Sequence, residues 1–293
     1  MIAYDTRRWV RPLVYFHRSD TFRKLLPTLL LTGLYTAGVY YLELHYLDLS
    51  SKSNVSNITV MHSLLGFALS LVLVFRTNTA YDRWWEGRKL WGQLVNVSRN
   101  LAVRMSAYLK ADDQADRDFY ARTIAAFAHE MRLHLQDEQT RFELDSEAHP
   151  EFGDVDTNKH MPSQVVKLLQ RRTQRLRRQE RIDGDQLIVL NRDLNAFLDI
   201  CGACERIKNT PIPYSYTTFI KKFVVIYVIT LPFGFVFSLG YLAIPVVMFI
   251  FYVLASLELI AEEIEDPFGR DTNDLPQEKL AAMIKENVVD ILA

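Results

Sequence analysis

The chain has 293 residues, of which 49% are hydrophobic and 24% are charged, and its formal net charge is −1. This balance gives no basis for nucleic-acid binding, so no nucleic-acid partner is expected. Two cysteines and an N-terminus without a cleavable signal pattern argue against a secreted, disulfide-built protein. A high apolar content beside many charges is typical of a membrane protein with a substantial soluble part.

The N-terminal segment, residues 1–24, is expected to stay in the cytoplasm because its basic residues outnumber its acidic ones. The basic residues are Arg7, Arg8, Arg11, Arg18, Arg23 and Lys24, against Asp5 and Asp20. Residues 25–47 are then apolar and long enough to form the first membrane-spanning helix, with Pro27 near the start, where a helix tolerates proline. The link that follows carries one basic residue, Lys52, as expected of an external loop.

Residues 55–75 are a second apolar segment of membrane-spanning length, and its polar and small residues gather on one side. At about 100° per residue they fall within an arc of about 140°. These residues are Thr59, His62, Ser63, Gly66, Phe67 and Ser70. A lipid-facing helix gains nothing from such a stripe, because polar groups in hydrocarbon need a partner or water. Two interpretations remain open: a helix–helix contact built on small residues, or a helix that lines a water-filled path.

The second span leads directly into residues 76–88, which contain neither a proline nor a turn signal, so the helix is expected to continue into the cytoplasm. Arginine, tyrosine and paired tryptophans suit the membrane–water interface. Asp82 and Glu86 lie four residues apart, with Arg83 and Arg88 as available partners. This pattern predicts a charge network at the membrane exit.

Residues 77–222 are predicted to be helical and cytoplasmic. His129 and His134 are interpreted as ordinary histidines, because neither a carboxylate nor a cysteine lies in ligand register with them. Cys201 and Cys204 form a CxxC pattern, but nothing around them indicates the strand-to-helix context of a redox site, so packing between helices is the interpretation. An arginine-rich helix over residues 165–182 is interpreted as a solvated face, with anion attraction or an oligomer contact as the alternatives.

Residues 223–240 and 243–261 are the third and fourth spans, and Pro232 and Gly234 are expected to interrupt and kink the third. Residues 262–293 return to the cytoplasm and end in an amphipathic helix. The predicted fold is therefore all-α: an integral membrane protein with four transmembrane helices and a large cytoplasmic helical region. Its segments are residues 1–24, 25–76, 77–222, 223–261 and 262–293, all in one structural unit.

Four motifs, in the right order along nearly the whole chain, resemble the bacterial branch of the bestrophin family. They are Leu65-Gly66-Phe67, the run from Arg76 to Glu86, Asn209-Thr210-Pro211-Ile212-Pro213 and Asp266-Pro267-Phe268-Gly269. The resemblance implies a homo-oligomer, a pentamer, around an axial pore lined by the second span. The family signature is expected to be architectural at Arg76, Asn78, Tyr81, Asp82, Arg83, Trp84, Trp85 and Glu86. In particular, Asp82 is expected to pair with Arg83 or another basic group.

The same resemblance implies a hydrophobic neck that closes by dewetting, and its register places Thr59, Ser63 and Phe67 there. Two hydroxyls stand where the family has apolar side chains, so a wetter and leakier neck is expected. His62, Gly66 and Ser70 complete the predicted pore-facing stripe. The family's cytoplasmic aperture falls at or beside Asp185, which in an oligomer becomes a ring of carboxylates that attracts cations. The alternative is that Asp185 caps the helix beginning near Gln186.

The function predicted on this basis is a channel for monovalent ions in the bilayer, with a lean to cations from Asp185. Chloride selectivity, as in the animal members of the family, is the alternative. Calcium is doubtful as a cofactor, because Arg270, Thr272 and Asn273 interrupt the acidic run and leave Asp271 and Asp274 at the matching positions. Asp274 is equally suited to cap the last helix.

No nucleophile–base set, phosphate loop or metal tetrad is found in the sequence, so neither an enzyme nor a catalytic residue is expected. A membrane-anchored redox or signalling protein is the competing class. A secondary transporter ranks lower, since internal repeats with interrupted helices in both halves are not found. The expected location is the inner membrane of a bacterium, in a multi-pass topology with both termini in the cytoplasm.

Overall fold

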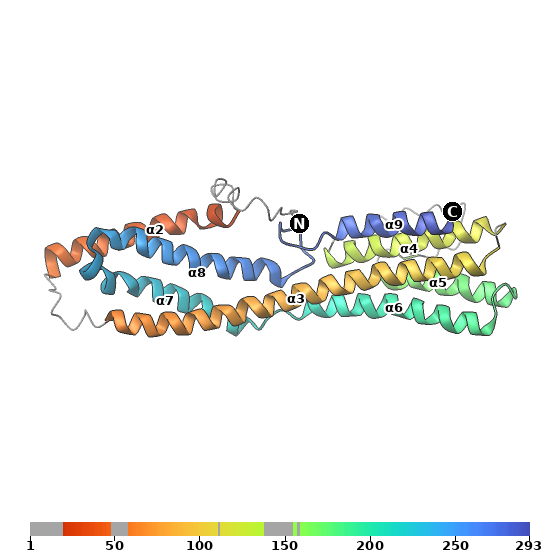
Figure 1. The fold of residues 1–293 in the computed structure, drawn as a ribbon, viewed down its shortest axis with the longest axis horizontal. Helices are drawn as coiled ribbons and strands as arrows, with labels where there is room; N and C mark the ends of the chain where they lie inside the picture. The colour runs from red at the N-terminus through yellow and green to blue at the C-terminus, as the bar shows by residue number, and fades with distance from the viewer. Residues whose placement is uncertain (1–19, 48–57, 111, 138–154, 157–158) are drawn as a thin grey trace. The chain divides into compact units, whose positions relative to one another are not determined.

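The computed structural model describes residues 20–47, 58–110, 112–137, 155–156 and 159–293 (Figure 1). In this part of the chain the elements are helical throughout, which confirms the predicted all-α class. They are α2 (Asp20–Leu42), the π-helical turn η2 (Glu43–Leu47), α3 (Ile58–Tyr108), α4 (Gln114–Leu135), α5 (Met161–Arg178), α6 (Gly184–Asn209), α7 (Tyr214–Leu239), the 3-10 turn η5 (Gly240–Leu242), α8 (Ala243–Glu265) and α9 (Gln277–Leu292).

The chain divides into two compact units. We call Arg83–Pro211 with Asp266–Ala293 the polar unit, and Ile2–Asp82 with Ile212–Glu265 the apolar unit. Helix α3 contributes residues to both, because it runs for 51 residues from Ile58 to Tyr108 without a proline. The predicted continuation of the second span beyond Arg76 is therefore confirmed.

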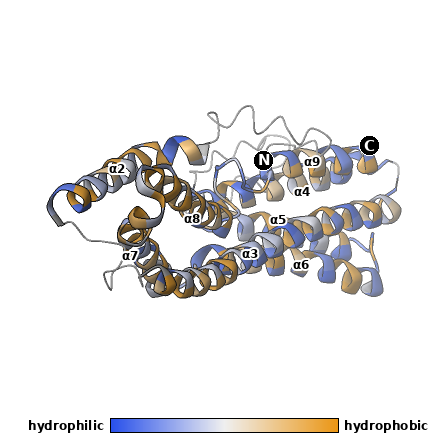
Figure 2. Cartoon of the chain, turned by 60° about the vertical axis from the view of Figure 1, so that its left-hand side comes forward, coloured by the Kyte–Doolittle hydropathy of each residue, from blue (hydrophilic) through white to orange (hydrophobic). Residues whose placement is uncertain are grey.

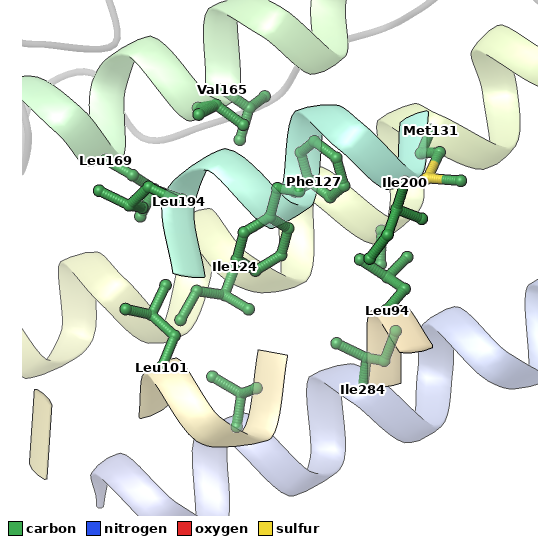
Figure 3. Close-up of a cluster of buried hydrophobic side chains, with 14 of the residues drawn as sticks. Leu94, Leu101, Ile124, Phe127, Met131, Val165, Leu169, Leu194, Ile200 and Ile284 are labelled. Carbon is green, nitrogen blue, oxygen red and sulfur yellow. The ribbon is translucent and has the colours of Figure 1, made fainter. Parts of the chain in front are cut away.

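The polar unit has a large hydrophobic core to which α3, α4, α5, α6 and α9 all contribute (Figure 3). At its centre the rings of Phe127 and Phe197 meet edge to face, with centroids 4.8 Å apart. Both side chains are fully buried. The residues labelled in Figure 3 come from all of these helices: Leu94, Leu101, Ile124, Phe127, Met131, Val165, Leu169, Leu194, Ile200 and Ile284. This unit therefore encloses its apolar side chains as a soluble helical domain does.

The apolar unit has a much smaller interior, in which α2 packs on α8 and α8 packs on α7. The buried cluster consists of Leu69, Leu73, Ile220, Val224, Val228, Leu231 and Val247. Large apolar side chains remain exposed on the same helices, among them Leu34, Phe67, Phe75, Ile226 and Phe249. Figure 2 shows the resulting hydrophobic colour along α2, α7 and α8. An apolar exterior of this kind is typical of helices that contact lipid.

Length and hydropathy give three candidate membrane spans among the described residues: Thr21–Tyr46, Val60–Tyr108 and Tyr214–Glu265. The last of them contains both α7 and α8. Helix α7 continues past Pro232 and Gly234 to Leu239, so the predicted interruption of the third span is wrong. Leu231, Pro232 and Gly234 are buried against neighbouring side chains, and this packing supports the helix where the proline lacks an N–H.

Candidate functional site

One face of α3 in the apolar unit carries the side chains predicted to form the neck. Ser63 is exposed, and Phe67, one turn later, is 68% exposed. Ser70 continues the same exposed side and donates its hydroxyl to the Gly66 carbonyl at 2.8 Å. The side chain of Thr59 lies outside the described residues. Because residues three and four apart share a helix face, Ser63, Phe67 and Ser70 form one exposed strip.

His62 and Gly66 border this strip on the side where α3 packs against α7 of the same chain. His62 is only 4% exposed, its Nε2 lies 2.9 Å from Thr230 Oγ1, and its ring meets that of Tyr227 edge to face. A Cβ at Gly66 would lie 2.7 Å from Tyr227 Oη. The buried His62 therefore packs within this chain rather than along the exposed strip, whereas the place of the half-buried Gly66 in the pore-facing stripe stays a prediction. On a helical wheel the exposed positions and the positions that pack on α7 fall within the same arc. The wheel does not show which side of the arc meets a neighbouring helix.

Arg76 is fully buried in the apolar unit and joins two of the motifs. Its Nη2 donates to Glu265 Oε2 at 2.7 Å, and its Nε lies 3.6 Å from Glu258 Oε1. Glu265 Oε1 accepts the backbone N–H of Ile212 at 2.7 Å. A buried guanidinium is tolerated only when paired, so this cluster fixes the end of α8 and the start of the 212–214 link on α3.

Arg83, the next arginine of the signature, binds backbone carbonyls in the polar unit. It donates to the carbonyls of Ile207 at 2.6 Å and Thr210 at 2.5 Å, the last turn of α6. These carbonyls have no partner within the helix, so the guanidinium completes the C-terminus of α6. The described contacts of Arg83 are thus with the end of α6, and the pairing of the exposed Asp82 with Arg83 or another basic group stays a prediction.

Trp84 and Gly87 join α3 to the segment before α9, also within the polar unit. The indole N–H of Trp84 donates to the Asn273 carbonyl at 3.0 Å. A Cβ at Gly87 would lie 3.2 Å from the ring of the buried Phe268, so a larger residue here would require that ring to shift by a few tenths of an ångström. Glu86 pairs with Arg206 at 2.7 Å, whereas Asn78, Tyr81 and Trp85 are exposed. The signature residues with described contacts thus join separate parts of the fold.

Asp185 occupies the exposed first turn of α6, but it does not cap the helix. The N-cap is Asp183, whose Oδ1 accepts the Gln186 N–H at 2.7 Å while Gln186 Oε1 accepts the Asp183 N–H at 2.9 Å. The capping prediction for Asp185 was therefore wrong by two residues. The acidic residue followed three positions later by glutamine is a capping-box pattern, and this signal was present in the sequence.

The arginine-rich helix α5 has two different faces. On one face Arg172 binds the buried Asp116. Arg181, which lies beyond the end of α5, binds the same carboxylate and lies 2.6 Å from Asp113, and its hydrogen bond lowers the pKa of Asp113. Other basic side chains line a cavity of about 720 Å³ beside α6, namely Lys167, Arg171, Arg175 and Arg178. Part of the predicted solvated face is thus used for ion pairs inside the chain, and the rest forms a basic groove.

The 269–277 segment does not use Asp274 as a helix cap. Its buried carboxylate accepts the Asp271 N–H at 2.5 Å, and α9 begins after Pro276. A Cβ at Gly269 would lie 2.7 Å from Asp274 Oδ2. The Asp271 side chain itself is exposed. The capping prediction for Asp274 is therefore wrong, and the carboxylate instead shapes its own turn.

Cys201 and Cys204 belong to the core of the polar unit. Burial raises the pKa of Cys201 to about 12 and also raises the pKa of Cys204. Redox chemistry requires an accessible thiolate, so the structure favours the packing interpretation over a redox site.

Sequence reasoning missed one cluster of titratable side chains, formed by His134, His160 and Glu205. Each imidazole Nε2 lies within hydrogen-bonding distance of the same Glu205 oxygen. The spacing along one helix relates His134 only to His129. It does not show that His134 meets His160, the N-cap residue of α5, and Glu205 in α6. His129 is exposed and lies outside this cluster.

Comparison with known proteins gives consistent matches along the chain. A family model described as Bacterial/Fungal Bestrophin protein matches residues 1–290. A Ralstonia nicotianae protein named voltage-dependent anion channel-forming protein is 31% identical over 295 residues, covering 100% of this chain and 94% of the relative. A protein of the same name from a Nostoc species is 36% identical over 243 residues, covering 80% of this chain and 79% of the relative.

The fold also matches solved structures. A crystal structure of a bacterial bestrophin homologue from Klebsiella pneumoniae superposes with a TM-score of 0.79 at 26% identity. The match covers 92% of this chain and 98% of that one.

Proposed function

The chain belongs to the bacterial and fungal bestrophin family, and from this premise we propose that it forms an oligomeric membrane channel whose axial pore is lined by α3. The observation that carries the proposal is the full-length family match together with the exposed strip of Ser63, Phe67 and Ser70. A strip that mixes hydroxyls with an aromatic ring suits a water-filled path better than lipid.

The neck of the proposed channel is built around Phe67. In a pentamer, one Phe67 from each copy would form a hydrophobic ring, and such a ring gates by dewetting. Ser63, and Thr59 one turn earlier, would line the same path with hydroxyls and keep it wetter. His62 is not part of this lining, because it packs on α7, whereas the half-buried Gly66 lies at its border. Asp185 on its exposed helix turn remains our proposed cytoplasmic aperture.

For the permeant ion we propose monovalent anions. The curated relatives carry the name voltage-dependent anion channel-forming protein, and the basic groove along α5 adds positive potential to the polar unit. The cation preference predicted from Asp185 is the alternative. For cations to be preferred, the negative potential of one ring of Asp185 carboxylates would have to exceed the positive potential of the basic groove in each copy. The basic residues of this groove are Lys167, Arg171, Arg175 and Arg178.

The proposed topology has four membrane helices: α2, the first part of α3, α7 and α8. The basic residues before α2 and the Lys221–Lys222 pair near the start of α7 support a topology in the inner membrane of a bacterium with both termini and the polar unit in the cytoplasm. The exposed apolar side chains of the apolar unit would then contact lipid or a second copy.

Reversal potential in a planar bilayer with a KCl gradient tests the permeant ion. Anion selectivity predicts a reversal potential with the same sign as the chloride equilibrium potential. A reversal potential close to the potassium equilibrium potential would contradict it. Asp185→Asn should move the reversal further toward chloride, because it removes a ring of negative charge. If the mutant and the wild type reverse at the same potential, Asp185 does not line the pore.

Single-channel conductance tests the neck independently of selectivity. Phe67→Ala should raise open probability because it removes the apolar ring, whereas Thr59→Ile with Ser63→Ile should lower it by drying the path. Met61→Ala is the matched control, because Met61 is also exposed, at 58%, but lies about 120° from Phe67 around the axis of α3. An unchanged conductance and open probability in both neck variants would overturn the neck assignment.

A further inference from the structure

Three metal-ligating side chains from separate segments converge in the polar unit. His134 lies near the end of α4, His160 caps α5, and Glu205 lies in α6. Glu205 Oε1 lies 2.6 Å from His134 Nε2 and 2.7 Å from His160 Nε2. One ligand atom from each residue lies within 4.8 Å of the other two.

We propose that His134, His160 and Glu205 bind a zinc-like divalent transition-metal ion, with water as the fourth ligand. Two imidazoles and one carboxylate are a ligand set that zinc uses in sites with an open position. Imidazole selects Zn²⁺, Co²⁺, Ni²⁺ or Cu²⁺, whereas Ca²⁺ and Mg²⁺ prefer oxygen ligands. This site is therefore chemically different from the acidic positions Asp271 and Asp274.

The arrangement needs only a small adjustment to admit the ion. Ligands about 2.0–2.1 Å from a tetrahedral zinc lie roughly 3.3 Å from one another, so the two nitrogen–oxygen distances would widen by about 0.6 Å. The side chains of His134, His160 and Glu205 are 34%, 37% and 29% exposed, which leaves room for this movement and a route from solvent. The imidazoles meet nearly perpendicularly, at 83°, so they do not stack flat against each other.

Ser163 supplies the outer contact that a metal-bound His160 needs. Its hydroxyl lies 2.6 Å from His160 Nδ1, and its backbone N–H lies 3.3 Å from the same atom. Without metal, Nδ1 accepts from Ser163 and Nε2–H donates to Glu205. With metal on Nε2, the proton sits on Nδ1 and is donated to the Ser163 hydroxyl, a pairing that orients metal-bound histidines.

The charges around the cluster are compatible with a cation. Lys208, one turn after Glu205, donates to the Asp137 carboxylate at 2.5 Å and to the His134 carbonyl at 3.3 Å. The charge of Lys208 is therefore balanced by the Asp137 carboxylate, and the described partners of the Glu205 carboxylate are the two histidines. Bound metal would tie together the end of α4, the start of α5 and α6.

Isothermal titration of Zn²⁺ into chelator-treated full-length protein in detergent tests the proposal. We expect one Zn²⁺ per chain, and Co²⁺ in its place should give the visible absorption of tetrahedral coordination. His134→Ala and Glu205→Gln should each weaken binding by at least about 10-fold. His160→Asn should do the same while it keeps a good N-cap residue on α5, so that loss of binding is separated from loss of folding.

His129→Ala is the matched control, because His129 lies exposed on α4 but outside the cluster. It should bind Zn²⁺ as the wild type does, and Zn²⁺ should raise the melting temperature of both proteins but not of Glu205→Gln. Wild-type affinity in His134→Ala and Glu205→Gln, or no saturable binding to the wild type, would overturn the site. Neither result depends on ion conduction.

Discussion

The two units of this chain differ in where their apolar side chains lie. The polar unit encloses Phe127 and Phe197 in a core shared by several helices. The apolar unit buries a small cluster and leaves side chains such as Leu34 and Phe249 exposed, at 73% and 67%. The difference indicates that the polar unit is stabilised by its own interior, while the apolar unit has the exposed apolar surface of helices that contact lipid.

Charged groups show the same contrast. In the apolar unit Arg76 is completely buried and has Glu265 and Glu258 beside it. In the polar unit the Glu86–Arg206 pair is largely exposed, at 43% and 64%. An exposed pair contributes little to stability, whereas a buried charge that loses its partner is strongly destabilising. The following experiments test this contrast.

The largest effect is expected from Arg76→Ala. It leaves the Glu265 and Glu258 carboxylates buried without a cation and should destabilise the protein by roughly 3–5 kcal/mol. Size-exclusion chromatography in detergent should show loss of the folded oligomer. Arg206→Ala removes the exposed pair and should leave the elution profile unchanged. Equal losses in both variants would contradict the difference between the units.

The next largest effect is expected from replacing a buried phenylalanine, compared with replacing an exposed one. Phe127→Ala opens a cavity in the polar core and should cost about 3–5 kcal/mol. Phe249→Ala removes an equally large ring from an exposed face of α8 and should change stability by only about 0.5 kcal/mol. Apparent melting temperatures in detergent measure both. A large drop for Phe249→Ala would show that another copy covers this face.

A smaller effect should distinguish two glycines of the apolar unit. Gly66→Ala places a Cβ against Tyr227 Oη and should cost about 1–3 kcal/mol. Gly38 has open space around it, so Gly38→Ala should be neutral or stabilise α2 by up to about 1 kcal/mol. Tyr227→Phe removes the clashing oxygen and should rescue Gly66→Ala in thermal unfolding. Failure of this rescue would contradict the α3–α7 contact.

The smallest effect is expected from thiol reagents. Because burial raises the pKa of Cys201 to about 12, its thiol stays protonated in the folded protein where an unfolded thiol ionises near 8.5. The resulting stabilisation is fully present below about pH 8.5 and is lost as the pH rises toward the folded value. Iodoacetamide at pH 8 should therefore label neither cysteine until denaturant is added, as mass spectrometry would show. Rapid labelling of folded protein would reopen the redox interpretation.

The local parts of this structure were predictable from the sequence. The unbroken course of α3 follows from the lack of proline between Ile58 and Tyr108, and the capping box at Asp183 and Gln186 is a local pattern that could have been found. Tertiary choices were not predictable in the same way. A helical wheel does not show that His62 meets Thr230, and no spacing along one helix shows that His134 meets Glu205.

Both units are discontinuous in sequence, and this has a consequence for biosynthesis. Helix α9 packs on α4, and α8 packs on α2, so each unit is completed by residues translated long after its first helices. Domains form as units during synthesis. The polar unit therefore waits for α7 and α8 to be translated before α9 is available to close it. In the meantime the surface of α4 that α9 will cover stays open, and a ribosome-bound chain at this stage should be a preferred client of chaperones.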